Sequence, residues 1–201
     1  MNIYFIRHGE SQFNKEGKLQ GQMDPPLSDK GEETASSLAR DMKETFVSSG
    51  REINAIYSSP LKRAKETADA ISGATGAPVR MAPNLQEIRL GDWEGRKISN
   101  IAKTPQFIQW RKNPQSITPP GGEEIKNFQD RAVTGIKKII EDNSQNDNII
   151  VVTHGGVIGA LISYALKEDI SNSMKRVPDN LSITSMEIDG AGEWKIASDL
   201  K

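Results

Sequence analysis

Short apolar runs alternate with longer amphipathic segments along most of the chain. The apolar runs are rich in β-branched and aromatic residues, as strands are, and they cover Asn2–Ile6, Ile53–Tyr57, Val79–Met81 and Asn148–Thr153. The amphipathic segments have helical spacing. Three of them cover Asp29–Val47, Glu123–Glu141 and Val157–Leu166, and a fourth opens at Ser59 and Pro60 and ends near Gly73 or Gly76. This alternation predicts an α/β fold, a three-layer sandwich whose mostly parallel central sheet carries helices on both faces.

Local signals support several of these elements. Ser28 is a suitable N-cap for the helix that begins at Asp29, because its hydroxyl can accept a hydrogen bond from a free backbone N–H group. Ser59 as a cap and Pro60 in the first turn would open the second helix in the same way. The run at 148–153 has no polar alternation, which is typical of a strand that is buried on both faces.

The remaining segments complete a single domain. Leu181–Ile188 and Trp194–Ala197 flank the turn Asp189–Gly192 and predict a C-terminal hairpin. The stretch at about 92–122 is a helical excursion between loops, and we expect it to cover the active site. No linker, repeat or low-complexity run divides the chain, so its 201 residues predict one domain, 1–201.

Composition removes several classes of protein. The chain has 26 Lys and Arg against 27 Asp and Glu, which argues against general nucleic-acid binding. It has no cysteine, so disulfides, thiol catalysis and Cys-ligated metals are excluded. No signal peptide is visible, and the most apolar stretch, Ile149–Leu166, is interrupted by polar residues and is no membrane span. These observations predict a cytoplasmic protein.

The chain has two histidines, and both follow predicted strands. Ligands of open α/β sheets bind beyond the carboxyl ends of the strands. Four groups fall at such ends: Arg7-His8-Gly9, Ser58-Ser59 with Arg63, Glu87, and His154-Gly155. Guanidinium groups match phosphate oxygens, and glycines let a backbone approach closely. The sequence therefore predicts a site for a phosphate dianion, with Glu87 as the group that could give or take a proton.

Each of these residues also has an ordinary structural interpretation. A single histidine after a strand is usually a structural residue, and Arg63 lies in a charge run that resembles a solvated helix face. Glu87 by itself would be an ordinary loop acid. The functional interpretation rests on their joint placement, because His8 and His154 stand next to glycine at two strand ends.

Five ordered segments resemble the motifs of the histidine phosphatase superfamily, the phosphoglycerate-mutase-like proteins. They are Ile6–Ser11 with Asn14, Leu19–Ser28 followed by Gly31, Ile56–Ala68, Leu85–Glu87 with Gly91–Gly95, and Val152–Gly156. The resemblance runs through nearly the whole chain. It implies the three-layer phosphoglycerate-mutase-like fold and an enzyme that needs no cofactor.

The resemblance also implies a role for each matching residue. His8 would be the nucleophile and become a phosphohistidine, and Glu87 would protonate the leaving oxygen and then activate water. The phosphoryl oxygens would be held by a set of basic, amide and loop residues: Arg7, Asn14, Gln20, Gly21, Arg63, His154 and Gly155. With two arginines and a second imidazole, no metal is required. A neutral His8 and a charged His154 would serve best, so we expect their pKa values to be separated.

Several functions remain open on the sequence alone. The segment after Glu87 departs from the Arg-His-Tyr sequence of cofactor-dependent phosphoglycerate mutases, which favours a phosphatase acting on a small phosphorylated metabolite. The substrates of similar phosphatases include α-ribazole phosphate, fructose bisphosphates and phosphoserine, and some relatives have broad specificity. A mutase and a non-catalytic phospho-ligand-binding module are the alternatives. A two-histidine metal site lacks a third ligand at a sensible spacing, and a homodimer is compatible with the sequence.

Overall fold

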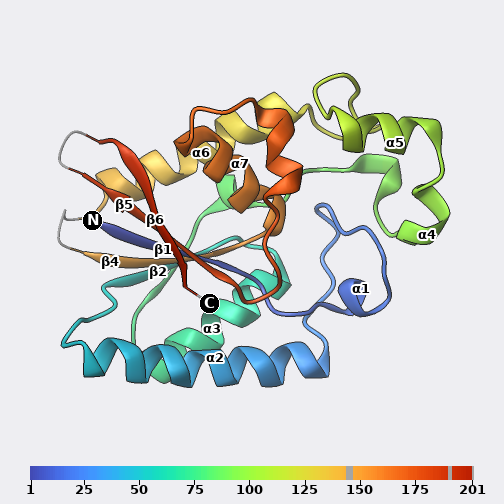
Figure 1. Ribbon diagram of the computed structural model, residues 1–201. Helices are drawn as coiled ribbons and strands as arrows, with labels where there is room; N and C mark the ends of the chain where they lie inside the picture. The colour runs from blue at the N-terminus through green and yellow to red at the C-terminus, as the bar shows by residue number, and fades with distance from the viewer. Residues whose placement is uncertain (144–146, 190–191, 201) are drawn as a thin grey trace.

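The computed structural model of the protein describes residues 1–143, 147–189 and 192–200 (Figure 1). Its strands are β1 (Asn2–Arg7), β2 (Ala55–Ser58), β3 (Val79–Met81), β4 (Asn148–Thr153), β5 (Ile183–Ile188) and β6 (Trp194–Leu200). Its α-helices are α1 (Gln12–Lys15), α2 (Asp29–Ser48), α3 (Lys62–Thr75), α4 (Ile98–Ile101), α5 (Pro105–Lys112), α6 (Ile125–Glu141) and α7 (Gly155–Ala165). Three short 3₁₀ helices are η1 (Pro83–Leu85), η2 (Gly91–Trp93) and η3 (Ile170–Lys175).

The strands form one sheet in the order β3-β2-β4-β1-β5-β6. The four strands from β3 to β1 are parallel, whereas β5 runs antiparallel to β1 and pairs with β6 as a hairpin. The α/β prediction with a mostly parallel sheet is therefore confirmed. Of the predicted hairpin turn, Gly190 and Ala191 lie outside the described residues.

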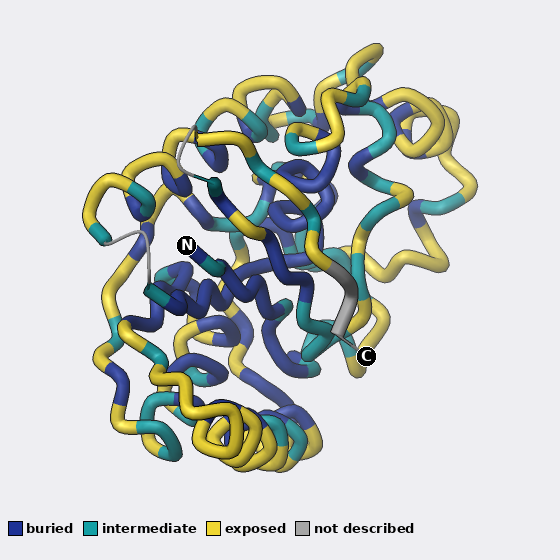
Figure 2. Tube along the Cα trace, turned by 60° about the vertical axis from the view of Figure 1, so that its left-hand side comes forward, coloured by how far each residue is buried: buried dark blue, intermediate teal, exposed yellow. Residues whose placement is uncertain are grey.

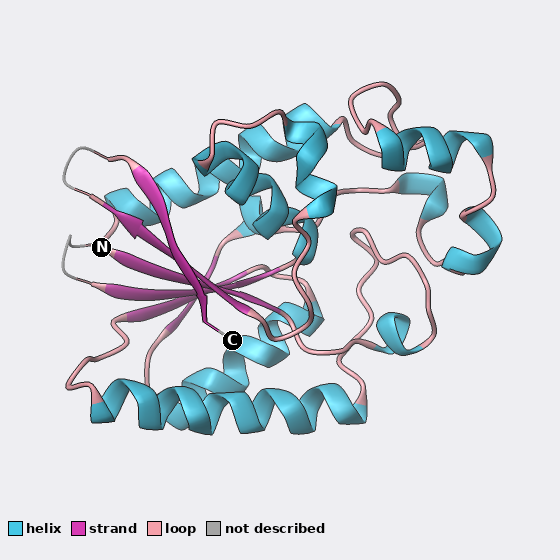
Figure 3. Ribbon diagram, viewed as in Figure 1, coloured by secondary structure: helices cyan, strands magenta, loops and turns pink. Residues whose placement is uncertain are grey.

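Helices cover both faces of the sheet and create two apolar cores (Figure 3). Alternate residues of β1 serve opposite cores: Ile3 and Phe5 belong to the larger one, and Tyr4 and Ile6 to the smaller one. The helices α6 and α7 supply the larger core, and α2 and α3 supply the smaller one. The strands thus form a buried band between two solvated layers (Figure 2).

The helix boundaries next to the site differ from the predictions. Helix α3 begins at Lys62 with Leu61 as its N-cap, two residues after the predicted Ser59 cap. The reason is that the Ser59 N–H donates to the Val152 carbonyl at 3.0 Å, so Ser59 still extends the sheet. Conversely, α7 begins at Gly155, directly after His154, and both helix starts therefore lie beside the ends of parallel strands.

The predicted excursion at about 92–122 contains two short helices, α4 and α5, that stand beyond the end of the sheet (Figure 1). Three aromatic rings fix it. Trp93 packs edge-on against Phe107 and Trp110, with ring centroids 5.3 and 5.6 Å apart. All three side chains are buried and belong to the larger core, so the excursion packs onto the body of the protein.

Within the described ranges, no helix has both the length and the apolar character needed to cross a membrane.

Candidate active site

The two histidines meet because of the register between β1 and β4. Arg7 pairs with Thr153, so the next residues, His8 and His154, are also neighbours, and their ring centroids lie 5.2 Å apart. The His8 ring is almost fully buried and places Nδ1 2.7 Å from the Gly9 carbonyl oxygen. A carbonyl can only accept, so Nδ1 carries the proton and Nε2 keeps its lone pair. The histidine predicted as nucleophile therefore presents an unprotonated nitrogen.

Arg63 comes from the first turn of α3 and lies beside that nitrogen. Its Nε is 3.3 Å from His8 Nε2, and its two terminal nitrogens donate to the Met23 and Gly21 carbonyls at 2.8 Å each. The side chain is 0% exposed, so the solvated-face interpretation of this arginine is wrong. Burial is the main cause that lowers the Arg63 pKa to about 10, which still leaves it charged at neutral pH.

Arg7 approaches the site from the opposite face of the sheet. Its Nη1 donates to the Pro178 carbonyl at 2.6 Å, whereas its buried Nε has no hydrogen-bond partner among the described residues. Burial lowers the pKa of Arg7, and the carboxylates of Glu87 and Asp179 offset part of this shift. Gly155 lies against this side chain, since a Cβ at Gly155 would be 3.3 Å from Arg7 Nε.

His154 lies behind His8 and is fully buried. Its Nε2 is 2.7 Å from Ser59 Oγ, and its Nδ1 has no partner among the described residues. The expected charge on His154 is wrong for the free protein. Burial, followed by the charge of Arg63, lowers the pKa of both His8 and His154 well below 6.5. Both rings are therefore neutral near pH 7.

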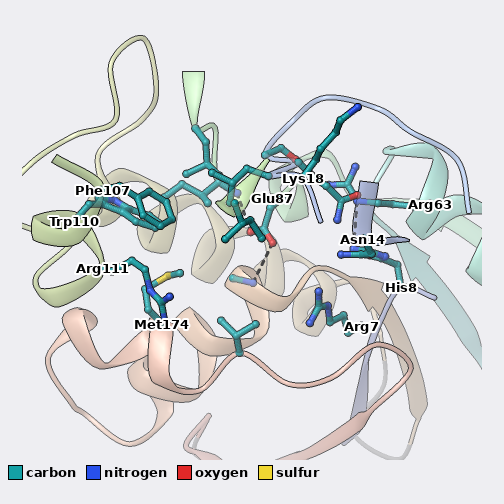
Figure 4. A pocket seen from close by; sticks show the side chains of 18 of the residues that line it. Arg7, His8, Asn14, Lys18, Arg63, Glu87, Phe107, Trp110, Arg111 and Met174 are labelled. Atoms are coloured by element: carbon teal, nitrogen blue, oxygen red, sulfur yellow. Dashed lines mark hydrogen bonds between the residues drawn. The ribbon is translucent and has the colours of Figure 1, made fainter. Parts of the chain in front are cut away.

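Glu87 faces the histidines from the loop after η1. One carboxylate oxygen accepts from the Ile88 N–H at 2.9 Å, and the other accepts from the Gly156 N–H at 3.1 Å (Figure 4). Gly156 permits this approach because a Cβ there would collide with the carboxylate. The N-terminus of α7 thus holds the predicted acid in place.

The predicted loop residues divide into two groups. Asn14 Oδ1 accepts from the Ser11 N–H and hydroxyl at 3.1 Å each, so its amide nitrogen is the end left for a ligand. Gln20 accepts from the same hydroxyl at 2.6 Å. Gly21 instead gives its carbonyl to Arg63, so its place in the structure is to orient that guanidinium.

These residues surround a cavity of about 460 Å³. Of the predicted site residues, seven line it: Arg7, His8, Asn14, Gln20, Gly21, Arg63 and Glu87. His154 and Gly155 lie outside the lining, behind His8 and Arg7 respectively. The described charged residues of the lining are five cations and one carboxylate: Arg7, Lys18, Arg63, Arg111, Lys175 and Glu87. In a chain of net charge -1, this cavity is suited to an anion.

Sequence reasoning missed Asn180, which precedes β5. Its side-chain amide donates to the His8 carbonyl at 2.7 Å and to the Gly9 carbonyl at 3.2 Å, and it lies 3.4 Å from Asn14 Oδ1. It therefore joins the nucleophile loop to helix α1, which carries Asn14. No local pattern marks this asparagine, because its partners are more than 160 residues away.

Sequence reasoning also missed Arg131, on α6. Its guanidinium donates to the carbonyls of Asn84, Gln86 and Glu87 at 2.7–2.8 Å, and it forms a two-point ion pair with Glu123. This side chain fixes the segment that ends in Glu87. Its place on the partly exposed side of an amphipathic helix resembles that of any solvated arginine.

The arrangement can hold an anion against an unprotonated imidazole nitrogen with a carboxylate opposite. The described residues contain no group of three or more His, Cys, Asp or Glu side chains that could bind a metal ion.

The chain is similar to several known proteins. Putative phosphoserine phosphatase 2 of Hydrogenobacter thermophilus is 29% identical over 192 residues, covering 94% of this chain and 90% of that protein. Probable phosphoglycerate mutase GpmB of Escherichia fergusonii is 32% identical over 170 residues, covering 83% and 75%. The structure of mycobacterial glucosyl-3-phosphoglycerate phosphatase in complex with VO3 has a TM-score of 0.86 at 27% identity, covering 98% of this chain and 97% of that chain. Residues 3–198 match the histidine phosphatase superfamily (branch 1), and the chain belongs to this family.

Proposed function

We propose that the protein is a metal-independent phosphomonoester hydrolase that acts on a small phosphorylated metabolite through a phosphohistidine. The observation that carries this proposal is the unprotonated Nε2 of His8 beside the Arg63 guanidinium, in a cavity that also contains Glu87. A nucleophile, a positive charge and a proton donor are the parts that phosphoryl transfer needs.

The reaction has two steps. First, His8 Nε2 attacks phosphorus, the P–O bond to the alcohol breaks, and the protonated form of Glu87 gives its proton to the leaving oxygen. Second, a water molecule attacks the phosphohistidine, its proton passes to Glu87, and the N–P bond breaks to release phosphate and restore His8. Arg7 and Arg63 neutralise the transferring group in both steps.

Arg7 and His154 are suited to the charge of the bound group. The Arg7 Nε, which can only donate, and the His154 Nδ1 are buried and have no hydrogen-bond partner among the described residues. Burial and, after it, the positive charge of Arg63 lower the pKa of His154 in the free protein, and a bound dianion would offset that charge. We therefore assign His154 to support of the His8 ring and of the phosphoryl charge, with Gly155 keeping Arg7 in position.

Hydrolysis is favoured over mutase activity by the segment after Glu87, which lacks the Arg-His-Tyr sequence of the mutases. Two similar proteins are named as phosphatases of phosphoserine and of glucosyl-3-phosphoglycerate, both of which are small phosphomonoesters. Another is named a probable phosphoglycerate mutase, so 3-phosphoglycerate conversion is the activity to measure in parallel. We also propose that the chain is one domain, with the excursion at 92–122 as the cover of the site.

The test compares the wild-type protein with His8→Asn in the presence of EDTA. The wild type should release phosphate from p-nitrophenyl phosphate and phosphoserine. Samples quenched in alkaline denaturant, in which a phosphohistidine survives, should carry one phosphoryl group by intact mass. His8→Asn should lose both signals, by at least about a thousandfold in rate. Activity within tenfold of wild type in this variant would remove His8 as nucleophile, and dominant 3-phosphoglycerate conversion would replace the hydrolase with a mutase.

A further inference from the structure

Two further cations line the cavity besides those near His8. Arg111 lies on α5, and Lys175 follows Met174 on η3, and both side chains belong to the cavity lining. Figure 4 shows Arg111 beside Met174, near Phe107 and Trp110, whereas Arg7, His8 and Arg63 lie at the opposite end with Glu87 between. The cavity therefore has a cationic group at each end, and Glu87 and apolar side chains lie between them.

Among the described residues, Arg111 and Lys175 have no acidic partner. Arg111 makes no side-chain hydrogen bond or ion pair with any described residue, and Lys175 contacts a neutral group, Asn172 Oδ1, at 3.1 Å. Lys18, which also belongs to the cavity lining, forms an ion pair with Glu16 at 2.5 Å. Arg111 and Lys175 thus keep their charge available to a ligand.

The position of Arg111 is fixed at its base. The preceding residue, Trp110, is buried against Trp93 and Phe107, and its indole N–H has no partner among the described residues. Buried indole N–H groups usually find an acceptor. A guanidinium and an unpaired indole N–H on adjacent residues are donors suited to an oxygen anion.

The phosphoryl group itself has no need of these residues, because Arg7 and Arg63 already flank His8. We propose that Arg111, with a contribution from Lys175, binds a second anionic group of the substrate. This inference rests on the proposed function and narrows it. The substrate is a phosphomonoester whose alcohol carries a carboxylate or a second phosphate on a body that packs against Phe107 and Met174.

The test uses three compounds that share one ring: phenyl phosphate, 4-carboxyphenyl phosphate and 1,4-phenylene bisphosphate. Their binding is measured by calorimetry to protein that carries His8→Asn, which prevents turnover, with and without Arg111→Gln. We expect Arg111→Gln to weaken the carboxylate, the bisphosphate or both by about tenfold, and phenyl phosphate by less than about twofold.

Lys112→Gln is the matched control, since Lys112 is the next residue of α5, is exposed and lies outside the cavity lining. It should leave all three affinities within about twofold, and Lys175→Gln should reproduce a smaller part of the Arg111→Gln effect. A loss for one anionic compound alone identifies the second group as carboxylate or phosphate. Equal changes for all three compounds, no change for any, or the same changes in Lys112→Gln would overturn the proposal.

Turnover separates this inference from the proposed function. If His8-intact protein fails to hydrolyse the three compounds while Arg111→Gln still weakens the anionic ones selectively, the hydrolase proposal fails and the second anion site stands. If it hydrolyses all three without an Arg111 effect on binding or KM, the hydrolase stands and the second site fails.

Discussion

The role of Glu87 depends on one proton, which the leaving oxygen must receive when the P–O bond breaks. Both carboxylate oxygens accept backbone N–H groups, and these two hydrogen bonds hold the side chain in place. Glu87→Gln keeps the size of the group and removes its proton. Poor leaving groups need that proton, whereas p-nitrophenolate leaves without it.

We therefore expect Glu87→Gln to slow phosphoserine hydrolysis by about a hundredfold and p-nitrophenyl phosphate hydrolysis by less than about tenfold. Steady-state rates on both substrates, with thermal melting to verify folding, measure this ratio. Equal slowing of the two substrates would mean that Glu87 acts on the phosphoryl charge rather than on the leaving oxygen.

Single residues of the site differ in how far sequence could reveal them. His8 and His154 were predictable because parallel strands end at the same edge, and the observed register places them side by side. The burial of Arg63 was not, because Lys62 and Lys65 surround it with the pattern of a solvated helix. Asn180 gave no signal, since its contacts depend on how β5 returns beside β1.

At the scale of elements, α6 controls the loop that presents Glu87. Arg131 reaches from α6 to three carbonyls of residues 84–87, and Glu123 holds the guanidinium by two contacts. Each of these carbonyls would need another donor if the guanidinium were removed. The helix therefore acts on catalysis through the position of Glu87.

Arg131→Gln should lower kcat by about 10-fold to 100-fold, because small displacements of a catalytic group are costly in rate. Because the variant would displace the acid Glu87, hydrolysis of phosphoserine should be slowed more than hydrolysis of p-nitrophenyl phosphate. Lys126→Gln on the same helix is the control, since its ion pair with Asp130 is exposed. A loss of melting temperature with an unchanged ratio of the two substrates would limit Arg131 to a structural role.

Strands and helices with a strong hydrophobic period could be predicted from the sequence. The first residues of some helices, and the shortest helices, could not. The strand Asn148–Thr153 has the predicted bounds, and Ser28 caps α2 as expected by accepting from the Gly31 N–H at 3.0 Å. Helix α3 starts later than predicted because the Ser59 N–H bonds to a carbonyl of β4. This contact between distant parts of the chain cannot be read from the local cap residues. The single-turn helix α1 was not predicted because four residues are too few to show a helical period.

At the scale of the whole molecule, the two histidines couple folding to pH. Both are buried beside Arg63, and their pKa values lie well below 6.5 in the folded protein. The unfolded chain exposes them, with a pKa near 6.5, so below that pH the unfolded state binds more protons than the native state. Their contribution to stability is complete above pH 6.5 and is lost as the pH falls below it.

The free energy of unfolding should therefore fall by up to about 2 kcal/mol between pH 6.5 and 5.5, about 1 kcal/mol for each histidine. Exposed carboxyl groups titrate below this window and add little to the slope. Urea unfolding at pH 7.5, 6.5 and 5.5, in buffers without phosphate, measures it. His8→Asn and His154→Gln should each halve the slope, whatever they do to stability at pH 7.5. A flat profile in the wild type, or an undiminished slope in both variants, would show that the rings are not held neutral by the fold.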